Sequence, residues 1–260
     1  EEDDSAWNKI KLPWHVHPER QLEDGSPDWD WREKKNETLG KRRATQEYDA
    51  EFGVSTDTYF DPRYIEEVEN KYLTKPEKDG NMWYWEKPKD NTEYIVAVDC
   101  AEGGNDNNVI QVFKIATLEQ VAEYVSNESY EEFGYLPVRV AKEYNGALLA
   151  IEQNSVGTAV TQRAIDLDYH NLYYRGTSSD SIALNEKTAK VGFKTTRRTR
   201  PLIIEAFRAL FETEDGIKIR SIRLINELKN FILKNGKAQA RSGFTDDAIM
   251  ATCIMCFIYN

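Results

Sequence analysis

The chain has 260 residues, of which 40% are hydrophobic and 30% charged, and its formal net charge is −11. This composition predicts a globular protein with a sizeable core. No apolar stretch approaches the roughly 20 residues of a membrane helix, and the acidic residues 1–4 are unlike a signal peptide. We therefore expect a cytoplasmic protein without a membrane partner. Its three cysteines, Cys100, Cys253 and Cys256, lie in apolar surroundings and are expected to be reduced core residues.

The charge is distributed unevenly along the chain. Residues 181–260 carry 14 basic and 8 acidic side chains, whereas acidic residues predominate before them. A basic final third is compatible with a phosphodiester substrate if a bound metal reverses the sign of nearby acids. Solvation of helices explains about half of these basic residues equally well.

Residues 1–90 differ from the rest, because they are polar, rich in tryptophan and hold six of the eight prolines. Periodicity predicts a helix within residues 30–52 and another over 62–72, which Asp61 caps. Proline and glycine in residues 75–91 indicate a linker with exposed aromatic residues. We expect Trp83, Tyr84 and Trp85 to pack on the following domain, although they could stack on nucleic-acid bases.

From residue 94 onward, the pattern alternates between strands and helices. Apolar and β-branched residues predict strands at 94–99, 109–115 and 119–125, joined as an antiparallel meander, and further strands at 147–151 and 172–174. Helices are predicted over the ranges 131–145, 156–167, 199–212, 221–233 and 246–259. A two-stranded piece is possible at 217–220. This order predicts an α/β fold, with one mixed central sheet flanked by helices and preceded by an N-terminal extension.

Acidic residues stand at the ends of three of these elements. Asp99 ends the strand at 94–99, Glu152 follows the strand at 147–151, and Asp246 and Asp247 open the last helix. Each acid alone is explained better by a turn, a solvated strand end or a helix cap. Taken together, they indicate a carboxylate cluster for Mg²⁺ or Mn²⁺, which prefer oxygen ligands. Two such ions suit phosphodiester hydrolysis.

These motifs, in this order, resemble the C-terminal nuclease domain of the large terminase subunit, the DNA-packaging protein of tailed bacteriophages. The resemblance rests on residues 98–106, 150–157, 224–231 and 246–251, and residues 46–53 resemble the end of the family's ATPase region. It implies an RNase-H-like fold in which Asp99, Glu152, Asp246 and Asp247 bind metal. Which aspartate of the pair binds directly stays open. Thr245 stands where many relatives have histidine.

The resemblance also implies a domain organisation and a biological role. Residues 1–60 are expected to be a remnant of the ATPase region or hinge, 61–92 a linker and 93–260 the nuclease domain. The chain contains no G-x-x-x-x-G-K-[ST] motif, so no ATPase activity is expected of it. The expected activity is endonucleolytic cutting of concatemeric viral DNA in the host cytoplasm, outside the mature virion. The expected partners are double-stranded DNA, the portal protein and the small terminase subunit.

A basic loop over residues 186–201 is the candidate DNA-contacting surface. Its candidate residues are Lys187, Lys190, Lys194, Thr195, Thr196, Arg197, Arg198 and Arg200. A solvated loop explains any single lysine almost as well. No base-reading motif is present, so weak sequence preference is expected. Two alternatives remain: a DNA- or portal-docking module that cuts poorly alone, and another RNase-H-like nuclease of the resolvase or transposase type.

Overall fold

The computed structural model describes residues 14–39, 48, 58–101, 106–175 and 190–260. It divides into two compact units, Glu1–Thr58 and Tyr59–Asn260. In the first unit, helix α1 (Trp29–Leu39) carries Trp31, whose ring packs against those of Trp14 and Tyr48. This helix confirms the beginning of the helix predicted within 30–52; residues 40–47 and 49–57 lie outside the described residues. Among the described helices, none combines the length and apolarity needed to cross a bilayer.

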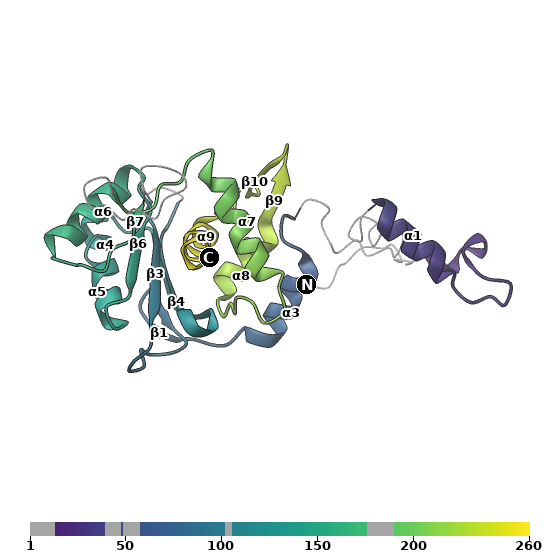
Figure 1. Ribbon diagram of the computed structural model, residues 1–260, viewed down its shortest axis with the longest axis horizontal. Coiled ribbons are helices and arrows are strands. Elements are labelled where there is room, and N and C mark those ends of the chain that lie inside the picture. Colours follow the sequence, from purple (N-terminus) through teal and green to yellow (C-terminus); the bar gives the residue numbers. More distant parts are fainter. Residues whose placement is uncertain (1–13, 40–47, 49–57, 102–105, 176–189) are drawn as a thin grey trace, which may run out of the picture. The chain divides into compact units, whose positions relative to one another are not determined.

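The second unit is organised around a mixed six-stranded sheet with the order β1-β2-β5-β4-β3-β6 (Figure 1). The strands are β1 (Glu77–Asp79), β2 (Met82–Tyr84), β3 (Tyr94–Asp99), β4 (Asn108–Lys114), β5 (Glu119–Ser126) and β6 (Leu148–Ile151). The predicted antiparallel meander is confirmed in β3, β4 and β5. β6 runs parallel to β3, so the C-terminal ends of these two strands lie side by side at the same end of the sheet.

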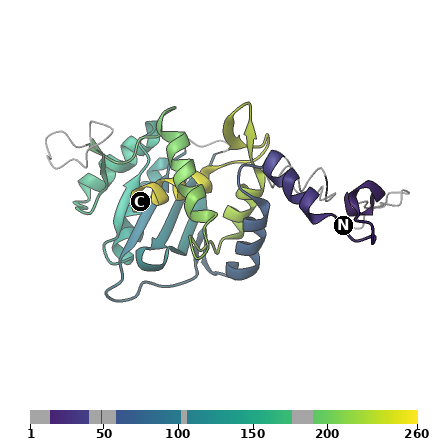
Figure 2. The ribbon, with the colours of Figure 1, turned by 45° about the vertical axis from the view of Figure 1, so that its right-hand side comes forward.

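Helices cover both faces of this sheet (Figures 1 and 2). One face carries α4 (Tyr130–Phe133), α5 (Leu136–Glu143) and α6 (Ser155–Asp166). The other carries α9 (Asp247–Tyr259), with α7 (Thr199–Phe211), α8 (Ile222–Asn230) and α3 (Pro62–Tyr72) packed outside it. Successive side chains of β3 point to opposite faces of the sheet. Ile95 and Ala97 pack in the hydrophobic core that contains α9, whereas Val96 and Val98 pack in the core on the other face, with α5 and α6. α9 is buried along most of its length, as its apolar sequence predicts.

The linker predicted over residues 75–91 requires correction, because it contains β1 and β2, which extend the sheet beyond β5. A turn at Gly80, whose φ is +55°, joins the two strands. Trp83 and Tyr84 are buried rather than exposed, which confirms their predicted packing on the domain. The guanidinium of Arg223 lies 3.5 Å from the ring centroid of Trp83. Residues 61–92 therefore contribute α3 and two strands to the second unit.

Two predicted helices also differ from the observed ones. The helix expected over 131–145 is divided into α4 and α5, because Pro137 is suited to a first helical turn and starts a new helix. The helix expected over 221–233 ends at Asn230, where the chain enters a hairpin of β9 (Phe231–Lys234) and β10 (Lys237–Ala240). The suggested two-stranded piece at 217–220 forms a single bridge between Lys218 and Glu119.

The remaining segments agree with the sequence in type. The predicted strand at 172–174 begins with a bridge at Leu172 and continues as β7 (Tyr174–Arg175), which pairs with β8 (Lys190–Val191). All three cysteines are free and buried, as expected. Burial raises the pKa of the Cys253 and Cys256 thiols well above their ordinary value, so both are unreactive residues of the core.

Candidate metal centre

Asp99 and Glu152 lie together at the ends of β3 and β6. The parallel pairing of these strands places Val98 opposite Ile151, and the backbone N–H of Glu152 donates to the carbonyl of Val98 at 2.9 Å. Glu152 is 9% exposed, so it is not the solvated strand end of the simpler interpretation. Asn154 fixes the turn that follows, because its side chain accepts from the N–H of Gly157 at 2.7 Å and so caps α6.

The start of α9 brings two further acids to the same edge. Asp247 is the first residue of the helix, and its Oδ2 accepts from the backbone N–H of Asn107 at 2.8 Å and from its side chain at 3.2 Å. Asp246 occupies the N-cap position, yet its side chain makes no capping hydrogen bond. It forms an ion pair with Arg200 instead, with 2.6 Å between Oδ2 and Nη2.

Glu227 of α8 supplies the cap that Asp246 does not make. Its Oε2 accepts from the backbone N–H of Ile249 at 2.9 Å, and its Oε1 accepts from the hydroxyl of Thr245 at 3.3 Å. These bonds fix the first turn of α9 and the residue before the acidic pair. Glu227 falls in residues 224–231, one of the stretches that resemble terminases, but the sequence indicates no role for it. Glu227 lies on a different helix from the acidic pair, so its contacts with Ile249 and Thr245 are visible only in three dimensions.

These acids line one pocket of about 290 Å³. Its walls are formed by Asp99, Cys100, Ala101, Asp106, Asn107, Glu152, Asn154, Ser155, Arg200, Asp246, Asp247 and Met250. Within the described ranges, no three His, Cys, Asp or Glu side chains are close enough, as they lie, to share one ion. The donor set nevertheless fits a hard divalent cation, because it offers several carboxylate oxygens and the amide oxygen of Asn107.

The electrostatics of the pocket reflect its crowded acids. Burial and the hydrogen bond with Glu152 raise the pKa of Asp99 well above its ordinary value, and the charges of the other two acids add to this effect. Burial also raises the pKa of Asp247 to about 6, although the hydrogen bonds from Asn107 oppose the change. Carboxylates that repel one another in this way gain most from a bound cation, which compensates their charge.

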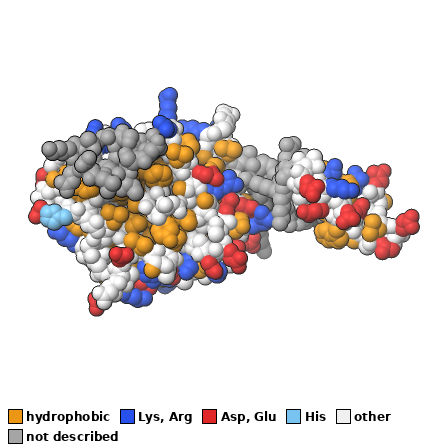
Figure 3. Space-filling view, in the orientation of Figure 1, with side chains coloured by type: hydrophobic (Ala, Val, Ile, Leu, Met, Phe, Trp, Pro, Cys, Tyr) orange, Lys and Arg blue, Asp and Glu red, His pale blue; other side chains and the backbone are white. Residues whose placement is uncertain are grey.

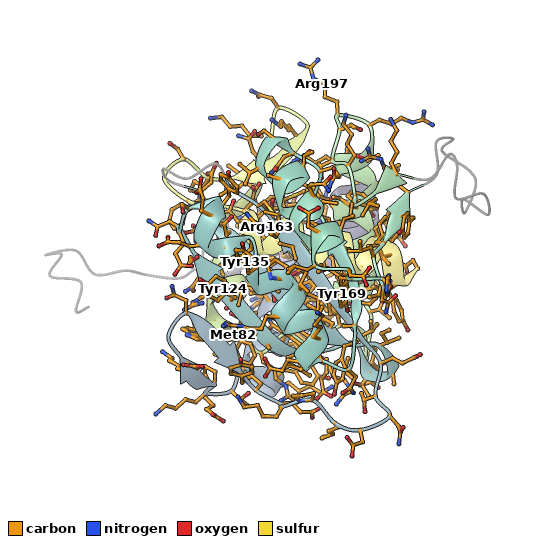
Figure 4. All side chains as sticks on the ribbon, turned by 90° about the vertical axis from the view of Figure 1, so that its left-hand side faces the viewer. Met82, Tyr124, Tyr135, Arg163, Tyr169 and Arg197 are labelled. Carbon is orange, nitrogen blue, oxygen red and sulfur yellow. The ribbon has the colours of Figure 1, made fainter. Side chains whose placement is uncertain are left out.

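The predicted DNA-contacting residues fall into two groups. Lys190 of β8 is exposed, as are Lys194, Thr196, Arg197 and Arg198 just before α7, and Arg197 extends away from the ribbon in Figure 4. Figure 3 shows Lys and Arg side chains along the upper edge of the molecule, where Figure 1 places the start of α7.

The second group, Thr195 and Arg200, is partly buried. A cavity of about 570 Å³ beside the acidic pocket is lined by Thr195, Thr196, Arg197 and Arg200, together with Lys237 of the β9–β10 hairpin. Arg200 lines both cavities. Lys237 was not among the predicted contacts, because the hairpin itself was not predicted. Lys187 lies outside the described residues.

The mixed sheet flanked by helices, with acids at the ends of adjacent strands, is the RNase-H-like fold expected from the sequence. No known protein-family model matches the chain. Its fold is similar to that of the large terminase nuclease from thermophilic phage G20c with bound cobalt, with a TM-score of 0.60 and 13% identity over 78% of this chain and 98% of that chain.

Two further solved structures show the same likeness. The G20c large terminase nuclease with bound magnesium has a TM-score of 0.59 and 13% identity, covering 78% of this chain and 98% of that chain. The large terminase nuclease domain of Thermus phage P74-26 has a TM-score of 0.54 and 13% identity, covering 74% and 92%. At this level of identity the likeness establishes the fold, so the predicted architecture is confirmed.

Proposed function

We propose that this chain is a metal-dependent DNA endonuclease that cuts concatemeric viral DNA during genome packaging. The observation that carries the proposal is the pocket in which Asp99, Glu152, Asp246 and Asp247 meet at the edge of the sheet. Proteins of the same fold include terminase nucleases solved with magnesium, cobalt and zinc. The oxygen-rich donor set favours Mg²⁺ or Mn²⁺ here, with two ions as the working arrangement.

The side chains divide the work of the proposed site. Asp99, Glu152, Asp246 and Asp247 would hold the divalent ions, which would supply a nucleophilic water and stabilisation of the leaving oxygen in phosphodiester hydrolysis. Asp99 ends β3, and Glu152 follows β6 with its backbone N–H bonded to Val98, so the sheet fixes both acids and they would set the position of the cations. Asn107 orients Asp247 through two hydrogen bonds, as neighbours of metal ligands commonly do. The exposed basic residues beside α7 contact the backbone of double-stranded DNA, which gives weak sequence preference.

The biological setting of this proposal follows the resemblance to terminases. Residues 1–60 are a remnant of the ATPase region or hinge, and this chain does not hydrolyse ATP. The portal protein and the small terminase subunit are its partners, and it acts in the cytoplasm of the infected host rather than in the mature virion.

Plasmid cleavage in Mg²⁺ or Mn²⁺ tests the proposal. We expect the wild-type protein to cut, and Asp99→Ala and Glu152→Ala to lose cutting by several orders of magnitude. Glu66→Ala is the matched control, because Glu66 is an exposed acid of α3. Unchanged cleavage in either pocket variant would refute the assignment. Binding of DNA without any cleavage by the wild-type protein would favour the docking-module alternative.

A further inference from the structure

Arg200 connects the acidic pocket with the neighbouring cavity that the basic residues line. It lies in the first turn of α7, whose start is fixed by two reciprocal hydrogen bonds. Thr199 Oγ1 accepts from the N–H of Thr196 at 2.8 Å, and Thr196 Oγ1 accepts from the N–H of Thr199 at 3.1 Å. The backbone therefore holds Arg200 between the candidate metal ligands and the candidate phosphate contacts.

The guanidinium group of Arg200 is only partly satisfied in this position. Nη2 donates to Asp246 at 2.6 Å, while Nη1 donates to the thioether sulfur of Met250 at 2.9 Å, which is a weak acceptor. Nε is buried and has no hydrogen-bond partner. A DNA phosphate offers two oxygens that accept parallel bonds from the guanidinium fork, so it satisfies Arg200 better than the present partners do.

The same ion pair affects what Asp246 can bind. The Arg200 bond occupies Oδ2, one of the two carboxylate oxygens that Asp246 can offer to a divalent cation. Both side chains are shielded, with 25% of Arg200 and 22% of Asp246 exposed, so solvent screens their attraction incompletely. A cation that uses Asp246 must therefore compete with the guanidinium.

We propose that Arg200 is a positioning residue that couples DNA binding to metal loading. It holds Asp246 in the free protein and releases it to the cation when the guanidinium turns to a DNA phosphate. This inference rests on the proposed nuclease function. By linkage, DNA then increases the affinity for metal by the same factor as metal increases the affinity for DNA. The protein is thereby kept from assembling its full metal site until DNA is present.

Manganese binding with and without DNA tests this coupling. Free Mn²⁺ is counted by electron paramagnetic resonance in titrations of the wild type, Arg200→Ala and Arg200→Lys, each alone and with a short DNA duplex. For the wild type we expect DNA to tighten Mn²⁺ binding about tenfold, within the usual range of such couplings. Arg200→Ala should bind Mn²⁺ about tenfold more tightly without DNA, and DNA should then add less than about twofold. Arg200→Lys, which keeps the charge but not the fork, should fall between them.

Arg198→Ala is the control for general electrostatics, because it removes one exposed positive charge from the same segment. We expect it to weaken DNA binding while Mn²⁺ affinity without DNA stays at the wild-type value. Equal effects of Arg198→Ala and Arg200→Ala on that affinity would overturn the inference, as would DNA-dependent Mn²⁺ binding that survives in Arg200→Ala. Both results leave the proposed function intact. Failure of the folded wild type to bind Mn²⁺ with or without DNA would overturn both. Circular dichroism verifies that each variant is folded.

Discussion

Glu227 tests whether the first turn of α9 positions the acidic pair. In Glu227→Ala, the N–H of Ile249 and the hydroxyl of Thr245 lose their acceptor. A hydrogen bond contributes about 1 kcal/mol, and a buried donor left unsatisfied costs about 1–3 kcal/mol. Since only the backbone N–H bond is short, we expect a loss of about 1–3 kcal/mol in the free energy of unfolding. For a domain of this size, that corresponds to a melting temperature lower by about 2–12 °C.

The same substitution should impair cutting more than its effect on stability would explain. A displacement of about 1 Å in a reacting geometry can cost about a hundredfold in rate, so we expect Glu227→Ala to cut DNA at least about tenfold more slowly at a temperature where it is folded. Glu227→Gln keeps an acceptor oxygen for the N–H of Ile249 and should therefore behave as wild type. Asn226→Ala, on an exposed position of α8, is the control. Wild-type cutting and melting in Glu227→Ala would refute this reasoning.

Three further predictions concern the rest of the unit. Gly192→Ala should lose about 1–3 kcal/mol in urea unfolding, because φ is +82° and a Cβ atom would lie 2.8 Å from a backbone oxygen. Burial alone would raise the pKa of Glu119, but hydrogen bonds from Lys114 and Arg220 lower it to about 2. This depressed folded-state pKa stabilises the fold above about pH 4.5, and the effect disappears as pH falls toward 2. Glu119→Gln should therefore lose about 1–3 kcal/mol at pH 7 and nearly nothing near pH 2, measured by chemical unfolding. Magnesium at about 100 times its Kd should stabilise the wild type by about 2.7 kcal/mol in thermal unfolding and should not stabilise Asp99→Asn, which should be no less stable than wild type in metal-free buffer.

The convergence of the acids could be predicted because it depends on rules that are local in sequence. Asp99 and Glu152 each follow an apolar run, and parallel pairing of such strands brings their C-terminal ends together. The helix that Asp247 opens is apolar on all sides, so it had to be buried against the sheet. Strand ends and a buried helix are therefore sufficient to predict that the carboxylates converge.

The two hairpins were missed although both carried a recognisable turn signal. Asp79-Gly80 joins β1 to β2, and Asn235-Gly236 joins β9 to β10. In the first case, the charged residues of β1 resemble a solvated linker, since this edge strand is exposed on both faces. In the second, the helical periodicity of α8 continues into Phe231, which belongs to β9. In both cases, the turn dipeptide predicts the hairpin more reliably than the composition of the flanking residues does.

The partners of the acids could not be predicted in the same way, because they come from distant elements. Asp246 is the N-cap of α9 and Asp247 is its first residue, and the two side chains have different hydrogen-bond partners. Asp247 turns to Asn107, just before β4, while Asp246 turns to Arg200 of α7. The first contact is a pair of neutral donors that orients a carboxylate, and the second is an ion pair that competes for one. This difference supports different roles for the two aspartates. Asp247 is free to bind metal with or without DNA, whereas Asp246 binds metal only when DNA has drawn Arg200 away from it.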